Sequence, residues 1–190
     1  WLVTVLAALS MTYGNIVAIS QTNIKRLLAY SGIAQIGNLL IGVAAGTKTG
    51  GDSLLFYLWT YLFASVGAFT VVIIFSNLTD SDNIEDYNGL SRRSPFLAFA
   101  MLIFLLSLAG VPPLAGFIGK LYIFAAAMKE GLIALVTIGA VNIVISLYYY
   151  LIVIKKIYVN PAKDPSSIPV PLPLKAVIMI TIAGVLILGI

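Results

Sequence analysis

One lysine, Lys120, stands in a long apolar run shortly after two adjacent prolines. The run reads LSLAGVPPLAGFIGKLYIF, and we expect its helix to break because prolines lack a backbone N–H and their rings clash with the preceding turn. The residues assigned to the break are Gly110, Pro112, Pro113 and Gly116. Backbone groups freed inside a membrane need protein or water as partners, and discontinuous helices commonly mark ion and substrate sites in transporters.

The expected depth of Lys120 makes its charge unusual. Lys120 precedes Lys129, which we expect at the membrane surface, by nine residues, or roughly 13 Å of helix. A lysine side chain reaches about half that distance, so snorkelling does not explain it. An intramembrane charge costs at least ~2.5 kcal/mol, and the sequence offers no intramembrane carboxylate as a partner. We interpret Lys120 as a proton-transfer residue; the alternative is a structural lysine that donates to carbonyls of the broken helix.

Polar side chains on neighbouring apolar segments indicate a hydrated interior around this lysine. Those assigned to a hydrated pathway are Gln35, Asn38, Tyr57, Thr60, Tyr61 and Ser65. Their helical spacing places them on shared faces of two helices. Further along, Asn142 and Ser146 lie a turn apart, before the triple tyrosine Tyr148–Tyr150. The simpler interpretation of each group is that its side chains form hydrogen bonds between neighbouring helices, or, for the tyrosines, that they anchor the helix at the membrane interface.

The composition places these residues in a membrane protein. Hydrophobic residues make up 61% of the 190 residues and charged residues 9%, which is outside the range of soluble domains. The chain has no cysteine and no histidine, which removes disulfides, thiolate metal sites, iron–sulfur clusters and histidine-ligated haem. It also has no glycine-rich nucleotide loop. The net charge of +4 is scattered between apolar runs, so it favours a membrane and not nucleic acid.

Six segments are long and apolar enough to cross a bilayer, which takes about 20 helical residues. They cover residues 1–21, 27–46, 53–76, 95–128, 131–154 and 173–190. The runs are too long and continuous for barrel strands. The sequence therefore predicts an all-α polytopic membrane bundle of six helices, one of them discontinuous at Gly110–Pro113, in a single transmembrane domain over residues 1–190. Because both ends fall inside apolar runs, we expect a C-terminal piece of a longer protein.

Lysine and arginine are distributed unevenly between the two sides of this bundle. One side receives Lys25, Arg26, Arg92, Arg93, Lys155, Lys156, Lys163 and Lys175. The other side receives Lys48 and Lys129. Because cytoplasmic loops carry an excess of basic residues, we expect the larger set in the cytoplasm and both ends of the chain on the outer side.

Three stretches carry a resemblance to a known family: QTNIKRLLAYSGIAQIGNLLIG, LSLAGVPPLAGFIGKLYIF and SLYYYLIVIKKIY. In order and spacing they resemble the last helices of the antiporter-like, proton-translocating subunits of NADH-quinone oxidoreductase (respiratory complex I), in the subunit N type. The first stretch is shared across antiporter-like subunits, whereas the second and the triple tyrosine are more specific. The segment LLFYLWTYLFASVGAFTVVIIF lacks the histidine and lysine that larger antiporter-like subunits and related sodium/proton antiporters carry there, which favours subunit N.

The resemblance implies a fourteen-helix subunit with two inverted five-helix repeats, of which this chain would be helices nine to fourteen. Lys120 matches the lysine of the second broken helix, which in the family belongs to a chain of buried lysines and a glutamate that moves protons. The implied partners are other membrane-arm subunits, including neighbouring antiporter-like subunits, and the lipid bilayer. NADH, flavin, iron–sulfur clusters and quinone would be bound by other subunits, so we expect no cofactor, metal or redox centre in this chain.

The function expected on these grounds is that of a proton-translocating subunit of an NADH:quinone oxidoreductase in the bacterial inner membrane. Electron transfer elsewhere in the complex would drive proton movement through Lys120. One alternative is a subunit of a multisubunit cation/proton antiporter, which would work without NADH or quinone. The other alternative is a scaffold subunit of the membrane arm, in which the lysine is structural.

Overall fold

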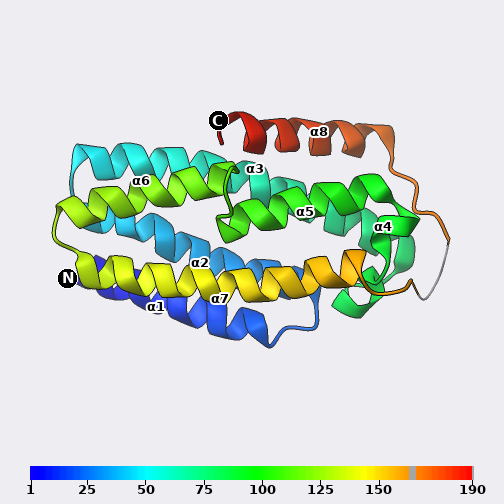
Figure 1. Cartoon of the computed structure of the whole chain (residues 1–190), viewed down its shortest axis with the longest axis horizontal. Coiled ribbons are helices and arrows are strands. Elements are labelled where there is room, and N and C mark those ends of the chain that lie inside the picture. The colour runs from blue at the N-terminus through cyan, green and yellow to red at the C-terminus, as the bar shows by residue number, and fades with distance from the viewer. Residues whose placement is uncertain (163–165, 190) are drawn as a thin grey trace.

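The computed structural model of the chain describes residues 1–162 and 166–189, so Lys163 and Ile190 lie outside the described residues. The described part is helical, with no strand beyond one isolated bridge between Asn23 and Asn83, and this confirms the predicted all-α bundle (Figure 1). The elements are α1 Leu2–Ile19, α2 Ile24–Ala45, α3 Lys48–Thr79, the 3-10 helix η1 Ile84–Tyr87, α4 Leu90–Arg93, α5 Pro95–Ala109, α6 Ala115–Lys129, α7 Ile133–Tyr158 and α8 Leu172–Ile187.

The described residues form eight α-helices where six were expected, for two reasons. The predicted segment 95–128 is divided into α5 and α6, which follow one another along a single crossing in Figure 1. The loop 80–94 also folds locally, into η1 and the four-residue α4. Helices α1, α2, α3 and α7 are long and apolar enough to cross a membrane by themselves, whereas α5 and α8 are shorter apolar helices.

Helix α3 is the segment whose predicted bounds, 53–76, were most in error. It begins five residues earlier because Thr47 is its N-cap and accepts a hydrogen bond from the Gly50 amide at 3.2 Å. The stretch TKTGG resembles a linker in sequence. In the structure, Gly50 instead packs against Gly42 of α2, where a Cβ on Gly50 would stand 2.6 Å from the Gly42 carbonyl oxygen. Close helix packing thus overrides the low helix propensity of glycine.

Apart from Lys163, which lies outside the described residues, the two sets of basic residues lie at opposite ends of the bundle. One end, called here the basic end, carries the α1–α2 turn, η1, α4 and the last turn of α7, and lies on the right in Figure 1. The segments of this end are joined by the Asn23–Asn83 bridge and by the Gly89 amide, which donates to the Lys156 carbonyl at 3.0 Å. Lys48 and Lys129 lie at the other end, at the start of α3 and the end of α6. The bundle therefore has the charge asymmetry of a membrane protein with two distinct sides.

Candidate functional site

The break between α5 and α6 begins with a capped helix end. Gly110 has φ +83°, a left-handed conformation that suits glycine, and follows the last residue of α5. The Val111 amide donates to the Leu106 carbonyl at 3.0 Å, and the Gly110 amide donates to the Ser107 carbonyl at 3.0 Å. This pair of bonds is a Schellman motif, which ends a helix in a defined way. The chain then passes through the cis peptide bond between Pro112 and Pro113 and begins α6 at Ala115.

The break leaves one carbonyl for the buried lysine. In a continuous helix the amide of residue 112 would donate to the Leu108 carbonyl, but Pro112 has no N–H. Lys120 Nζ donates to that carbonyl oxygen at 2.7 Å, and Gln35 Nε2 donates to it at 2.9 Å. The Lys120 side chain is 3% exposed. Because the C-terminal end of α5 carries partial negative charge, it favours a cation at this position.

Glycines bring the two halves of the broken helix close enough for this contact. A Cβ on Gly110 would stand 3.0 Å from Lys120 Cδ and 3.3 Å from its Nζ. Gly116 lies against α5 more tightly still, and its amide donates to Ser107 Oγ at 3.2 Å. Gly110 and Gly116 therefore allow α5 and α6 to meet closely beside the lysine side chain, and the Ser107 hydroxyl caps an amide at the start of α6.

The same carbonyl connects the lysine to buried polar side chains on α2 and α3. Gln35 Oε1 accepts from Asn38 Nδ2 at 3.2 Å and also from the Tyr57 hydroxyl. The Thr60 hydroxyl donates to the Tyr57 carbonyl at 2.8 Å. All four side chains are buried. The structure thus brings four of the six predicted pathway residues into one hydrogen-bonded group that ends at Lys120.

The other two predicted pathway residues are placed differently. The Tyr61 hydroxyl faces α2, where a Cβ on Gly32 would stand 3.0 Å from it. Ser65 is only partly buried, and among the described residues no hydrogen bond of its side chain joins it to the group around Gln35. The gap lined by Tyr57, Thr60, Tyr61 and Ser107 is too small for a water molecule. The side chains along α3 are therefore closely packed in this conformation.

A second buried polar cluster joins α1 to α7. Asn15 Nδ2 donates to Asn142 Oδ1 at 2.9 Å, and the Tyr149 hydroxyl donates to Asn15 Oδ1 at 2.9 Å. Asn142 Nδ2 also donates to the Thr12 hydroxyl at 3.4 Å. The sequence reasoning noted Asn142 and missed Asn15. The single asparagine of α1 is itself a signal, because asparagine side chains on membrane helices commonly hydrogen-bond to another helix.

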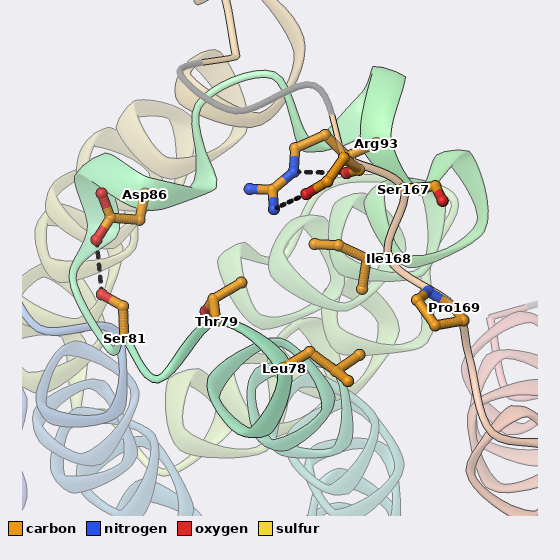
Figure 2. Close-up of a pocket in the computed structure, with 9 residues that line it drawn as sticks. Leu78, Thr79, Ser81, Asp86, Arg93, Ser167, Ile168 and Pro169 are labelled. Atoms are coloured by element: carbon orange, nitrogen blue, oxygen red, sulfur yellow. Dashed lines mark hydrogen bonds between the residues drawn. The ribbon is translucent and has the colours of Figure 1, made fainter.

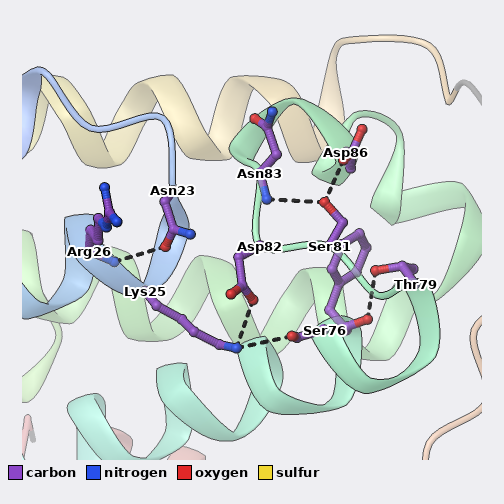
Figure 3. Close-up of polar contacts among 10 residues, drawn as sticks. Asn23, Lys25, Arg26, Ser76, Thr79, Ser81, Asp82, Asn83 and Asp86 are labelled. Carbon is purple, nitrogen blue, oxygen red and sulfur yellow. Dashed lines mark hydrogen bonds and ion pairs between the residues drawn. The ribbon is translucent and has the colours of Figure 1, made fainter.

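Charged contacts at the basic end hold the loops together. Lys25 bonds to Asp82 at 2.8 Å and donates to Ser76 at 3.0 Å, as Figure 3 shows. The hydrogen bond from Lys25, followed by that from Ser76, lowers the pKa of the Asp82 carboxyl below its usual value of 3.8. Nearby, Arg93 Nε donates to the Ser166 carbonyl at 3.1 Å beside a cavity of about 420 Å³ (Figure 2). The Lys25 contacts hold the end of α3 and the α3–η1 loop against the start of α2, and the Arg93 contact joins α4 to the segment before α8.

Comparison with known proteins shows that the chain is similar to membrane subunits of quinone oxidoreductases and of Mrp antiporters. Residues 1–146 match the family model described as NADH:quinone oxidoreductase/Mrp antiporter, transmembrane. NADH-quinone oxidoreductase subunit N of Desulforamulus reducens is 49% identical over 189 residues, which are 100% of this chain and 40% of that protein. NAD(P)H-quinone oxidoreductase subunit 2 of a Picosynechococcus species is 51% identical over 164 residues, 86% of this chain and 31% of that protein.

Solved structures of membrane complexes contain chains with a similar fold. A chain of respiratory complex I from Thermus thermophilus with bound aureothin has a TM-score of 0.85 and 36% identity, and the match covers 98% of this chain and 42% of that chain. A chain of the Mrp complex from a Dietzia species has a TM-score of 0.90 at 23% identity, over 100% of this chain and 44% of that one, which shows a shared fold. The chain spans about two fifths or less of the length of the two curated relatives.

Proposed function

Because the chain belongs to the NADH:quinone oxidoreductase/Mrp antiporter transmembrane family, we propose that it belongs to a proton-translocating membrane-arm subunit of an NADH:quinone oxidoreductase. The observation that carries the proposal is the buried Lys120 side chain, whose Nζ donates to the carbonyl that the helix break leaves open. A titratable side chain inside a membrane is a functional residue by default, and this one lies where a discontinuous helix supplies polar partners.

The geometry around the lysine keeps its acceptor carbonyl paired in either protonation state. When Lys120 is protonated, its ammonium donates to the Leu108 carbonyl. When it loses its proton and turns away, the carbonyl keeps its second donor, Gln35. A buried carbonyl left without any donor would cost about 1–3 kcal/mol, and the second donor removes that penalty. Gln35 in turn is held by Asn38 and Tyr57, so the acceptor stays in place through both states.

Proton movement in this proposal runs from the interior of the subunit through Lys120 to the outer side. Gln35, Asn38, Tyr57, Thr60, Tyr61 and Ser65 would line the hydrated part of that route. Since the gap beside Thr60 and Tyr61 does not admit water in this conformation, the route requires a local opening between α3 and α5. Such a gate separates the two sides of the membrane between transfers, which a pump needs in order not to leak.

The remaining parts of the proposal concern the assembly. The 190 residues would form one transmembrane domain, packed against other membrane-arm subunits in the bacterial inner membrane, with the basic end in the cytoplasm. NADH oxidation and quinone reduction would occur in other subunits, which would hold the flavin, iron–sulfur clusters and quinone. This chain would contribute proton translocation to the oxidoreductase and no redox centre of its own.

Proteoliposomes that contain the whole complex, loaded with a pH-sensitive dye, distinguish the proposed function from antiport. We expect proton translocation to begin on addition of NADH and quinone and to stop when either is exhausted. A sodium or potassium pulse without NADH should leave the internal pH unchanged. Proton movement driven by such a pulse, with none driven by NADH, would instead identify a cation/proton antiporter.

A further inference from the structure

The cavity beside Arg93 opens at the basic end of the bundle, between the end of α3, η1, α4 and the segment before α8 (Figure 2). Its volume of about 420 Å³ lies within the usual range of small-molecule sites, roughly 300–1,000 Å³. Hydroxyl groups line it from Thr79, Ser81, Ser166 and Ser167. Helix α3 is apolar and long enough to cross a membrane, and it ends at Thr79. The cavity therefore borders the headgroup region of a bilayer that α3 crosses.

Two side chains of opposite charge face this cavity from different elements. In Figure 2, Arg93 of α4 lies above the cavity and Asp86 of η1 lies to its left. Arg93 Nε donates to the Ser166 carbonyl at 3.1 Å, and the guanidinium carbon stands 5.9 Å from the centre of the Phe75 ring. Asp86 Oδ2 accepts from the Ser81 hydroxyl at 2.6 Å. Both charged groups are thus held in position before a ligand arrives, which lowers the entropic cost of binding one.

The apolar side chains of the cavity lie together on one border. Leu78 belongs to the last turn of α3 and is 50% exposed. Ile168 and Pro169 belong to the segment before α8, where the Ile168 amide donates to the Arg93 carbonyl at 3.1 Å. In Figure 2 these three side chains lie at the lower right, away from Asp86. The cavity is therefore charged on one side and apolar on the other, as a site for the headgroup end of a phospholipid must be.

The two charged groups suit different parts of one ligand. The planar guanidinium of Arg93 suits a phosphate, which it can bond through two parallel N–H groups. The carboxylate of Asp86 suits an ammonium that carries N–H donors. A ligand with only an anionic group would be repelled by Asp86, and a ligand with only a cationic group would be repelled by Arg93. The pair therefore favours a zwitterion that links a phosphate to a primary ammonium, which is the chemistry of phosphoethanolamine.

We propose that this cavity binds the headgroup of a phosphatidylethanolamine molecule from the surrounding bilayer. Its phosphate lies on Arg93, its ammonium lies on Asp86, and its acyl chains leave the cavity over Leu78. The bound lipid joins η1 and α4 to the segment that leads into α8, so it holds the basic end of the bundle together. The proposal does not depend on proton transfer through Lys120, and either proposal can fail without the other.

Photolabelling of the whole complex in nanodiscs tests the site. The nanodiscs contain equal amounts of phosphatidylethanolamine and phosphatidylglycerol, with a trace of phosphatidylethanolamine that carries a diazirine in one acyl chain. We expect label on the peptide that contains Leu78, and we expect Arg93→Gln to reduce it roughly tenfold, because the phosphate loses a charge-assisted hydrogen bond. Arg92→Gln is the matched control, since Arg92 precedes Arg93 in α4 but is exposed and does not line the cavity. Wild-type labelling in Arg93→Gln would overturn the proposal.

The composition of the nanodiscs identifies the headgroup. Additional unlabelled phosphatidylethanolamine should reduce the labelling more strongly than additional phosphatidylglycerol, which has no ammonium, or phosphatidylcholine, whose ammonium has no N–H. Asp86→Asn should abolish the preference for phosphatidylethanolamine over phosphatidylglycerol, whereas Asp80→Asn, outside the cavity, should keep it. Equal competition by the three lipids would show non-selective contact with the bilayer. Displacement of the label by inorganic phosphate would show a site for a free anion, and either result would overturn the proposal.

A thiol in the cavity wall tests occupancy while both charged side chains are intact. The 190 residues contain no cysteine, so Ser167→Cys is identified by its own peptide. We expect it to react several-fold more slowly with a neutral maleimide in nanodiscs of phosphatidylethanolamine than in nanodiscs of phosphatidylcholine. Arg92→Cys, outside the cavity, should react at the same rate in both. Equal rates for Ser167→Cys in the two lipids would show that the lipid headgroup does not cover the cavity, and would overturn the proposal.

Discussion

Gly116 is where the two halves of the broken helix come closest, and one added methyl group there tests whether this contact positions Lys120. A Cβ on Gly116 would stand 1.8 Å from the Ser107 carbonyl oxygen and 2.7 Å from its carbonyl carbon. Cβ atoms essentially never lie under 3.0 Å from such atoms, and ordinary contact begins at 3.4 Å. Gly116→Ala must therefore separate α5 from α6 by about 1.6 Å at this point.

Because of that separation, we expect Gly116→Ala to lower both the stability of the protein and its rate of proton uptake. Overpacking at a contact this tight should cost about 3 kcal/mol of unfolding free energy. The same shift moves Lys120 Nζ, now 2.7 Å from the Leu108 oxygen, beyond hydrogen-bond distance. Because a misplacement of about 1 Å can slow a positioned transfer ~10²-fold, we expect coupled proton uptake to fall by about tenfold or more.

Gly51→Ala is the matched control, because no heavy atom lies within 4 Å of a Cβ at Gly51 in α3. Alanine favours a helix over glycine by up to about 1 kcal/mol, so this variant should be as stable as the wild type or more so. The assays are the thermal unfolding midpoint of the complex in mild detergent and proton uptake in vesicles. Wild-type values of both for Gly116→Ala would contradict this prediction, because the junction would then tolerate separation.

Three further predictions follow from contacts on either side of the junction. Gln35→Leu leaves the Tyr57 hydroxyl and the Asn38 side-chain amide without their acceptor and should cost about 1–3 kcal/mol of stability, measured as a lower unfolding midpoint in detergent. Asn142→Leu breaks the α1–α7 cluster and should cost about 1 kcal/mol in the same assay. Since the hydrogen bond from Lys25 lowers the pKa of Asp82 below 3.8, the ion pair stabilises the fold above about pH 4, and this stabilisation is lost as the pH falls through the lowered value. Asp82→Asn should therefore have a flatter dependence of the unfolding midpoint on pH between 5 and 3, and an unchanged dependence would contradict this assignment.

Much of the architecture could be predicted because the length and hydropathy of apolar segments identify membrane helices. The break was readable because proline has no amide hydrogen and a bulky ring, properties that act locally whatever the rest of the chain does. The division of basic residues between the two ends could also be predicted, because it depends only on which loops of the sequence carry lysine and arginine. The early start of α3 could not be predicted from the sequence, because it depends on Gly50 packing against Gly42 of a different helix.

The partners of the candidate site depended on tertiary structure. Sequence spacing placed Gln35, Asn38 and Tyr57 on helix faces, but it did not show that Gln35 and the lysine share one carbonyl. Asn15 and Asn142 are 127 residues apart in the chain, so neither position indicates the other. The expectation of Ser65 in the same group followed helical periodicity alone, and in the structure Ser65 is only partly buried.

The most direct test of the central claim is the number of protons translocated per electron pair by a complex carrying Lys120→Ala, measured in sealed vesicles beside electron flow and assembly. Lys129→Ala, at the exposed end of the same helix, is the control. We predict that the complex with Lys120→Ala assembles, that its coupled electron flow falls sharply, and that it moves fewer protons per electron pair, while the control matches the wild type. A Lys120→Ala complex that assembles and pumps with the wild-type ratio would contradict the account and make the lysine a structural donor to the broken helix.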